Sequence, residues 1–221
     1  MHRTLFVLFC CLLAPSAGHA GAWMREKGKT FVAAQSTVRM TGLIFSTETD
    51  IYIDHGVTER LSAGFALFDD GRNSGHMLVF LRHPLRSGRG GAQMAVEYGL
   101  GVQYTPVLRQ SMYRLTFAYG RGFNWGRGYG WVNIDTTVEM RAAGNAPTYK
   151  ADATLGQSSG RKVRPMFKLG LEQAQNAPLT WAASAHVMID GPRDITWLVG
   201  VERKRSGGGS TAVSLGLWRK F

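Results

Sequence analysis

Three side chains that could together perform acyl transfer lie in one short segment, residues 179–190. Ser184 offers a nucleophilic hydroxyl, His186 a general base and Asp190 a carboxylate that could orient the base. They occupy alternate positions and would share one face of a strand. Residues two apart on a strand have Cα atoms about 6.6 Å apart, and Asp190 lies further still. We therefore expect no catalytic relay, but a histidine that is hydrogen-bonded to a neighbour.

Other residues capable of chemistry lack the spacing that their chemistry needs. His55, His76 and His83 are scattered, without the separation of metal ligands. Two Gly-Arg-Gly triplets, at 120–122 and 126–128, have the character of loop glycines. They do not link a buried strand to a helix, which excludes a phosphate-binding loop. We assign no catalytic, cofactor-binding or metal-ligating residue and expect no cofactor.

The elements that carry these residues are segments of roughly ten residues separated by turn residues, a pattern typical of transmembrane β-barrels. An even strand count is expected when both chain ends lie in the periplasm, and twelve satisfies it, with ten as the alternative. The twelve segments are 29–40, 48–56, 60–69, 76–83, 91–103, 110–121, 130–141, 148–156, 164–173, 179–190, 195–204 and 210–221. The fold class expected is an all-β, antiparallel transmembrane barrel.

Each segment has two faces of different character. In 131–141, an apolar face that includes Ile134 and Val138 alternates with a polar one that includes Thr137. A soluble sandwich alternates too, but six aromatic residues lie near segment ends, where barrels place them at the head-group level. These six are Trp125, Tyr129, Trp131, Trp181, Trp197 and Trp218. Charges are much cheaper towards a lumen than towards lipid, which gives a set of expected lumen-facing residues. That set is Asp54, Glu97, Arg114, Asp135, Glu139, Arg141, Lys150, Asp152, Lys168, Glu172 and Glu202.

The C-terminal stretch 211–221 alternates apolar residues with small ones and ends on Phe221, with Arg219 as a departure from the pattern. It resembles the terminal strand of bacterial outer-membrane β-barrels, which the assembly machinery recognises by a final Phe preceded by alternate apolar residues. The resemblance to these small, porin-like barrels covers the whole chain after residue 20. It implies that Phe221 is an assembly signal and that the barrel-assembly machinery is a partner.

The N-terminal 20 residues have the features of a cleaved signal peptide. A basic start at Arg3 precedes an apolar run of eleven residues, 4–14, and small residues follow at 18–20. Cleavage after Ala20 would remove both cysteines, and the remaining 201 residues, 21–221, would form a single barrel domain without disulfides. Loss of Arg3 leaves 25 Lys and Arg against 15 Asp and Glu, a surplus of 25 − 15 = +10.

Such a basic, exported chain suits an anionic membrane surface better than nucleic acid. We expect a monomer in the outer membrane, in contact with lipid and with lipopolysaccharide. Basic residues gather at segment ends, in 25–29, 82–89, 161–164 and 203–205. With the N-terminus in the periplasm, the cluster 203–205 falls outside the cell and the other clusters that connect strands fall inside.

Three activities stay open. The first is a narrow channel or transporter for small solutes, selected by charges of both signs in the lumen. The second is a non-conducting structural or accessory barrel, filled by ion pairs, with a role in the envelope or in secretion. Eight strands give a filled barrel and sixteen a channel, so twelve does not decide between these two. The third, a lipid-modifying enzyme, is disfavoured by the geometry around His186.

Overall fold

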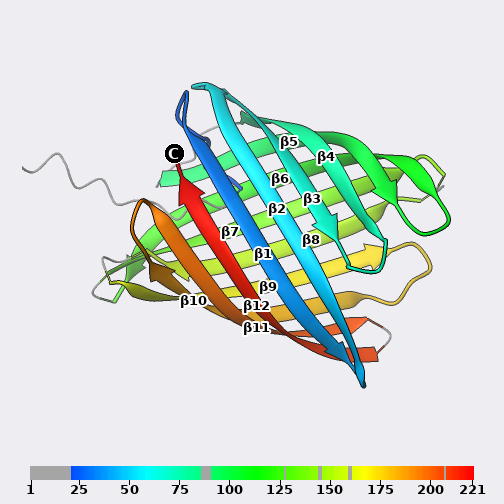
Figure 1. The fold of residues 1–221 in the computed structure, drawn as a ribbon. Coiled ribbons are helices and arrows are strands. Elements are labelled where there is room, and N and C mark those ends of the chain that lie inside the picture. The colour runs from blue at the N-terminus through cyan, green and yellow to red at the C-terminus, as the bar shows by residue number, and fades with distance from the viewer. Residues whose placement is uncertain (1–20, 86–90, 127, 144–145, 159–160, 207) are drawn as a thin grey trace, which may run out of the picture.

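The chain forms a closed antiparallel barrel of twelve strands (Figure 1). The structure is a computed structural model and describes residues 21–85, 91–126, 128–143, 146–158, 161–206 and 208–221. The strands are β1 (Thr30–Thr41), β2 (Ile44–Thr58), β3 (Leu61–Asp69), β4 (Gly75–Pro84), β5 (Ala92–Tyr104), β6 (Arg109–Trp125), β7 (Gly128–Arg141), β8 (Thr148–Gln157), β9 (Val163–Ala174), β10 (Thr180–Asp190), β11 (Ile195–Ser206) and β12 (Gly208–Lys220). Each strand pairs with its neighbours in sequence, and β1 closes the barrel against β12. The expected fold class and strand count are confirmed.

The two ends of the barrel differ in what they carry. Thr30 and Phe221 exchange backbone hydrogen bonds, with Phe221 N 2.9 Å from Thr30 O, so both termini lie at one end. We call this end the near rim; it also carries the turns after β2, β4, β6, β8 and β10. The opposite end, the far rim, carries the turns after the odd-numbered strands. The expected signal peptide, residues 1–20, lies outside the described residues.

The outer wall of the barrel is apolar. On β12, Val213 and Leu215 point outward and are 57% and 56% exposed, whereas the intervening Ser214 points inward and is 6% exposed. The same alternation runs round the barrel, because register partners on adjacent strands share a face. A wide apolar band therefore surrounds a polar interior, the arrangement that a barrel in lipid requires. No helix in the described part of the chain is long and apolar enough to cross a membrane.

The strands are longer than expected at two places. A tight turn containing Gly42, with φ of +61°, lets β2 begin at Ile44 rather than at residue 48. Strand β6 continues to Trp125, so the triplet 120–122 lies within a strand and not in a loop. Gly120 fits there because it faces inward, where a Cβ atom would come 2.5 Å from the ring of Trp23. The glycine that suggests a turn in the sequence is thus required by close packing inside the barrel.

Residues 21–29, which we call the N-terminal segment, enter the lumen at the near rim before β1 begins. Ala22 is 2% exposed, and its backbone N–H donates a hydrogen bond to Asn133 Oδ1 of β7 at 3.1 Å. The Trp23 ring meets that of Trp131 edge to face, with centroids 6.4 Å apart. The side chain of Arg25 is also buried. The N-terminal segment is thus part of the barrel's packed interior.

Candidate functional site

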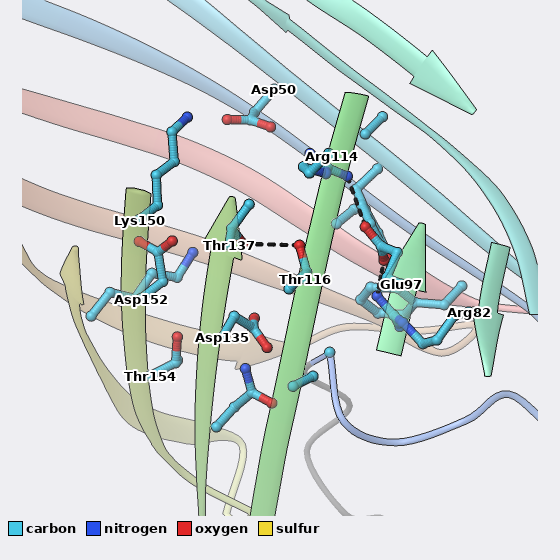
Figure 2. A pocket seen from close by; sticks show the side chains of 18 of the residues that line it. Asp50, Arg82, Glu97, Arg114, Thr116, Asp135, Thr137, Lys150, Asp152 and Thr154 are labelled. Carbon is cyan, nitrogen blue, oxygen red and sulfur yellow. Dashed lines mark hydrogen bonds and ion pairs between the residues drawn. The ribbon is translucent and has the colours of Figure 1, made fainter. Parts of the chain in front are cut away.

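A cavity of about 380 Å³ occupies the lumen, and its lining includes charged side chains of β2 and of β4 to β9 (Figure 2). Its lining includes five basic side chains and five carboxylates. The basic ones are Arg25, Arg82, Arg114, Lys150 and Lys168, and the carboxylates are Asp50, Glu97, Asp135, Glu139 and Asp152. Inward alternation of polar residues on neighbouring strands produces this lining, and we take the cavity, which we call the central chamber, as the candidate site.

A continuous chain of ion pairs crosses one wall of the central chamber. Arg25 Nε lies 2.8 Å from Asp54 Oδ2, and Arg82 Nη1 lies 3.1 Å from the same oxygen. Arg82 continues to Glu97, with Nη2 and Oε2 2.5 Å apart, and Arg114 Nη2 lies 2.9 Å from Glu97 Oε1. Burial lowers the pKa of Arg25 from its ordinary value, and the charge of Asp54 opposes that shift. Three guanidinium groups thus share two carboxylates, a fixed arrangement with one surplus positive charge.

Aromatic rings hold Arg82 at the centre of this chain. Its guanidinium lies 5.7 Å from the ring centroid of Tyr52 and 5.6 Å from that of Phe80, and these two rings stack on each other. The guanidinium also donates a hydrogen bond to the Tyr52 hydroxyl. Cation–π contacts of this kind gain strength when the charge is removed from water. We conclude that Arg82 is a rigid part of the wall rather than a mobile charge.

A second group of ion pairs covers the neighbouring wall. Glu139 of β7 accepts from Arg141 Nη2 at 3.1 Å and pairs with Lys150 Nζ of β8 at 3.0 Å. Lys150 lies 3.6 Å from Glu172 of β9, whose side chain is half exposed. Lateral pairing between adjacent strands fixes these side chains along the wall, which keeps them from filling the lumen.

A third group lies towards the far rim. Arg39 of β1 pairs with Glu48 of β2 at 2.5 Å and with Glu202 of β11 at 2.7 Å, and it donates a hydrogen bond to Ser210 Oγ of β12. This single arginine bridges the strands on both sides of the β1–β12 closure. It therefore supports the junction at which the barrel is sealed.

Four charged groups facing the central chamber form no ion pair with another described residue. They are Asp50 of β2, Asp135 of β7, Asp152 of β8 and Lys168 of β9. Asp50 and Asp152 are exposed to the lumen. Lys168 and Asp50 also line a smaller adjoining cavity of about 220 Å³. Because fixed pairs largely cancel one another, these free groups are the charges that a solute in the chamber would meet.

An aromatic partition separates the central chamber from a second cavity of about 310 Å³ at the near rim. Phe31, Trp131 and Trp218 line both cavities. The rings of Phe31 and Trp218 meet edge to face, with centroids 6.0 Å apart, and Arg25 lies over Phe31 at 4.4 Å. The second cavity, the near chamber, is also lined by Lys220 and by other charged residues. A solute crossing the barrel through both chambers must pass these three rings.

For two members of this partition, the expectation of a position in an aromatic girdle at the head-group level is wrong. Trp131 and Trp218 lie inside the barrel, where Trp131 is 2% exposed and packs with Met166 and Met188. Space for the ring comes from Gly156 on the adjacent strand, where a Cβ would lie 2.6 Å from it. Position near a strand end does not reveal which face a tryptophan takes, and that choice depends on the register.

The structure places the eleven expected lumen-facing residues on the inner wall. Asp54 is fully buried and defines the inner face of β2. Because register partners on adjacent strands share a face, the pairing of the strands then identifies the inward positions of all other strands. These residues are Asp54, Glu97, Arg114, Asp135, Glu139, Arg141, Lys150, Asp152, Lys168, Glu172 and Glu202. Ten belong to the central chamber or to the ion pairs beside it, whereas Glu202 lies with Arg39 near the far rim.

Sequence reasoning missed several residues of this site. Arg25, Arg82 and Arg164 belong to the basic clusters at segment ends, but Arg25 and Arg82 are buried in the lumen and Arg164 pairs with Asp190. Strand β4 hides its inward face because Leu78 and Phe80, which are apolar, precede Arg82 on that side. Arg82 lies two residues after Phe80 and therefore shares its inward face. Only this spacing would have indicated the position of Arg82 in the lumen.

The trio considered for acyl transfer divides into two separate contacts. His186 Nε2 lies 3.0 Å from Ser184 Oγ, as the sequence analysis expects for a histidine bound to a neighbour. Asp190 instead accepts a hydrogen bond from Arg164 and another from Thr196 Oγ1 at 3.0 Å. The carboxylate is therefore engaged away from the imidazole. No group of three potential ligands suited to a metal ion occurs among the described residues.

Solved structures share this fold at low sequence identity. An outer membrane channel from Pseudomonas putida F1 has a TM-score of 0.62 at 12% identity, covering 93% of this chain and 100% of that chain. The KdgM porin has a TM-score of 0.58 at 10% identity, covering 86% and 99%. The NanC porin has a TM-score of 0.57 at 9% identity, covering 84% and 98%. No family model and no curated protein matches the sequence. The chain has the barrel fold of outer-membrane porins.

Proposed function

We propose that this barrel is an outer-membrane channel that passes small polar solutes between the two sides of the membrane. The observation that carries the proposal is the pair of chambers inside the lumen, whose linings share the three rings of the aromatic partition. A filled barrel would place side chains where these cavities lie. The apolar outer band, with Trp181 and Trp197 facing outward near opposite rims, supports a position in lipid.

The size of the chambers limits what the channel would pass. Volumes of about 380 Å³ and 310 Å³ fall at the lower end of the range of small-molecule pockets, which is roughly 300–1,000 Å³. The three rings of the partition narrow the route further. These dimensions support passage of ions and of single small solutes in an extended orientation.

The charge of the central chamber supports weak selectivity. Its lining carries equal numbers of basic and acidic groups, and most of them are paired. One related structure is the KdgM porin in complex with disordered oligogalacturonate, which has a TM-score of 0.59 at 10% identity. In this chain a polyanion would meet three unpaired carboxylates and a single unpaired lysine among the described lining residues. We therefore propose neutral or zwitterionic solutes as the class that passes most easily.

We also propose contacts with the envelope, which follow from an orientation with both termini in the periplasm. Arg203 and Arg205 face outward near the far rim, and Trp181 is the register partner of Arg205. With the termini in the periplasm, this rim faces outside the cell, where the two guanidinium groups would meet lipopolysaccharide phosphates. Each such contact near a membrane surface is worth about 1 kcal/mol. We further propose that the barrel works as a monomer and that the assembly machinery recognises Phe221.

Planar-bilayer recording with the purified full chain tests the proposed channel function. We expect discrete, reproducible conductance steps after insertion, and no steps with heat-denatured protein as the control. A correctly folded, heat-modifiable barrel that inserts without conducting would contradict the channel and favour an accessory barrel. Hydrolysis of labelled lipid by such a silent barrel would favour the enzyme.

A further inference from the structure

Gly21 of the N-terminal segment lies directly against the carboxylate of Asp135. A Cβ atom built at Gly21 would come 2.8 Å from Asp135 Oδ1 and 3.1 Å from Oδ2. Any side chain at position 21 would therefore displace the carboxylate, and only glycine allows this approach. Asp135 projects from β7 into the central chamber (Figure 2). The main chain at residue 21 thus occupies the space beside a partly buried acidic group.

Asp135 lacks a counter-charge in this position. Its Oδ1 atom is buried and has no hydrogen-bond partner among the described residues. The residue forms no ion pair with any described side chain, although the ion-paired Arg82 and Glu97 line the same chamber. A buried carboxylate oxygen without a hydrogen-bond partner costs free energy that a cation in contact with it would recover. A positive group at the position of Gly21 would therefore stabilise this carboxylate.

Contacts on either side of Gly21 fix its position. Ala22 is bound through its backbone to Asn133, which lies two residues before Asp135 on the inner face of β7. Further along the N-terminal segment, Trp23 packs on Trp131 and Arg25 pairs with Asp54. These three contacts hold residues 22–25 in the lumen, so residue 21 cannot move far from Asp135.

We propose that Asp135 is the binding site for the chain's own terminal ammonium group, which cleavage after Ala20 creates on Gly21. The peptide nitrogen of an uncleaved chain is neutral, with one hydrogen to donate. Cleavage turns it into an ammonium with three donors, which matches an orphaned carboxylate. The uncleaved chain cannot form this ion pair, whereas the contacts of residues 22–25 are made in either form. This inference rests on the expected cleavage site and is independent of the channel function.

The accessibility of the terminal amine tests the proposal. Mature protein would be purified from outer membranes and its first residue identified by N-terminal sequencing. The folded barrel in detergent would then be treated at neutral pH with an amine-selective acylating reagent, and modification of the first residue followed by mass spectrometry. Only the unprotonated amine reacts, and both the ion pair and burial protect it. We expect modification to be about tenfold slower than in Asp135→Asn, corresponding to about 1.4 kcal/mol.

Asp152→Asn is the matched control. Asp152 is the register partner of Asp135, carries the same charge and lines the same chamber, but the three atoms nearest to a Cβ built at Gly21 all belong to Asp135. This variant should keep the slow modification of the wild type. Equal rates in the wild type and in Asp135→Asn, with Gly21 as the first residue, would overturn the proposal. A first residue other than Gly21 would overturn it as well, because no ammonium would then stand beside Asp135.

Discussion

Arg25, which precedes the first strand, forms an ion pair with Asp54 of β2 inside the barrel, with Nε and Oδ2 2.8 Å apart. The Asp54 side chain is completely buried, and the same oxygen also binds Arg82. One carboxylate therefore joins the N-terminal segment to the wall of the central chamber. Removal of this carboxylate therefore has a defined consequence.

Replacing Asp54 with Ala should destabilise the barrel by about 3–5 kcal/mol, because two buried guanidinium groups lose their shared partner. The midpoint of urea unfolding in detergent or lipid would measure the loss. Glu172→Gln provides the control, since the Glu172 side chain is half exposed and lies 3.6 Å from Lys150. That change should cost about 0–1 kcal/mol. Similar costs for the two variants would show that the buried ion pair does not anchor the N-terminal segment.

The two faces of a strand should differ sharply in their tolerance of arginine. Ile134 points outward from β7, and Ile134→Arg should cost about 2–4 kcal/mol if the residue faces mid-membrane lipid. Thr137 faces the lumen but is unsuitable as a control, because it is buried and hydrogen-bonded to Thr116. Thr154 of β8, which lines the central chamber, is better, and Thr154→Arg should cost much less. Equal costs would contradict the register, because a one-residue slip exchanges lipid and lumen.

Unpaired charges in the central chamber should set the ion preference of the channel. Asp152→Asn removes a negative charge exposed to the lumen and should shift the reversal potential in a salt gradient towards anions. Lys168→Gln should shift it towards cations. Glu59→Gln alters an exposed charge in the turn between β2 and β3 and should leave the potential unchanged. Shifts of the same sign in both lumen variants would show that ions do not pass these residues.

Phe221 should matter for biogenesis more than for stability. The residue is 53% exposed, with its ring under the Arg219 guanidinium at 4.2 Å, so it buries only part of the surface for which a Phe is worth about 1.5–3 kcal/mol. A chain ending at Lys220 should show a reduced heat-modifiable, protease-protected fraction in cells. Its unfolding midpoint after refolding in detergent should fall only modestly. Normal insertion of the shortened chain would contradict the role of Phe221 as an assembly signal.

Alternation of polar and apolar residues was sufficient to predict the barrel, its twelve strands and part of its inner acidic and basic residues. The pattern works on strands such as β7, where Ile134 faces lipid and Asp135 faces the lumen. It fails on β4, where inner Leu78 and Phe80 are as apolar as the outer residues and conceal Arg82. The alternation depends on a contrast between faces, and packing inside the barrel removes that contrast locally.

The aromatic partition and the N-terminal segment lay beyond sequence reasoning for a related reason. Trp131 and Trp218 come from strands far apart in the chain, and their meeting near Phe31 depends on closure of the barrel. Residues 21–29 precede the first strand and have no periodicity to interpret. Their position follows from contacts with Asn133 and Asp54, which only the three-dimensional register brings within reach.

The conductance of two tryptophan variants tests the central claim, that solutes pass through the lumen, most directly. Trp218 faces inward and belongs to the partition, whereas Trp197 faces outward on the adjacent strand, where it pairs in register with Leu217. We predict that Trp218→Ala enlarges the unitary conductance in planar bilayers and that Trp197→Ala leaves it unchanged. Heat modifiability would verify that both variants are folded. Unchanged conductance in a folded Trp218→Ala barrel would contradict a solute path across the partition.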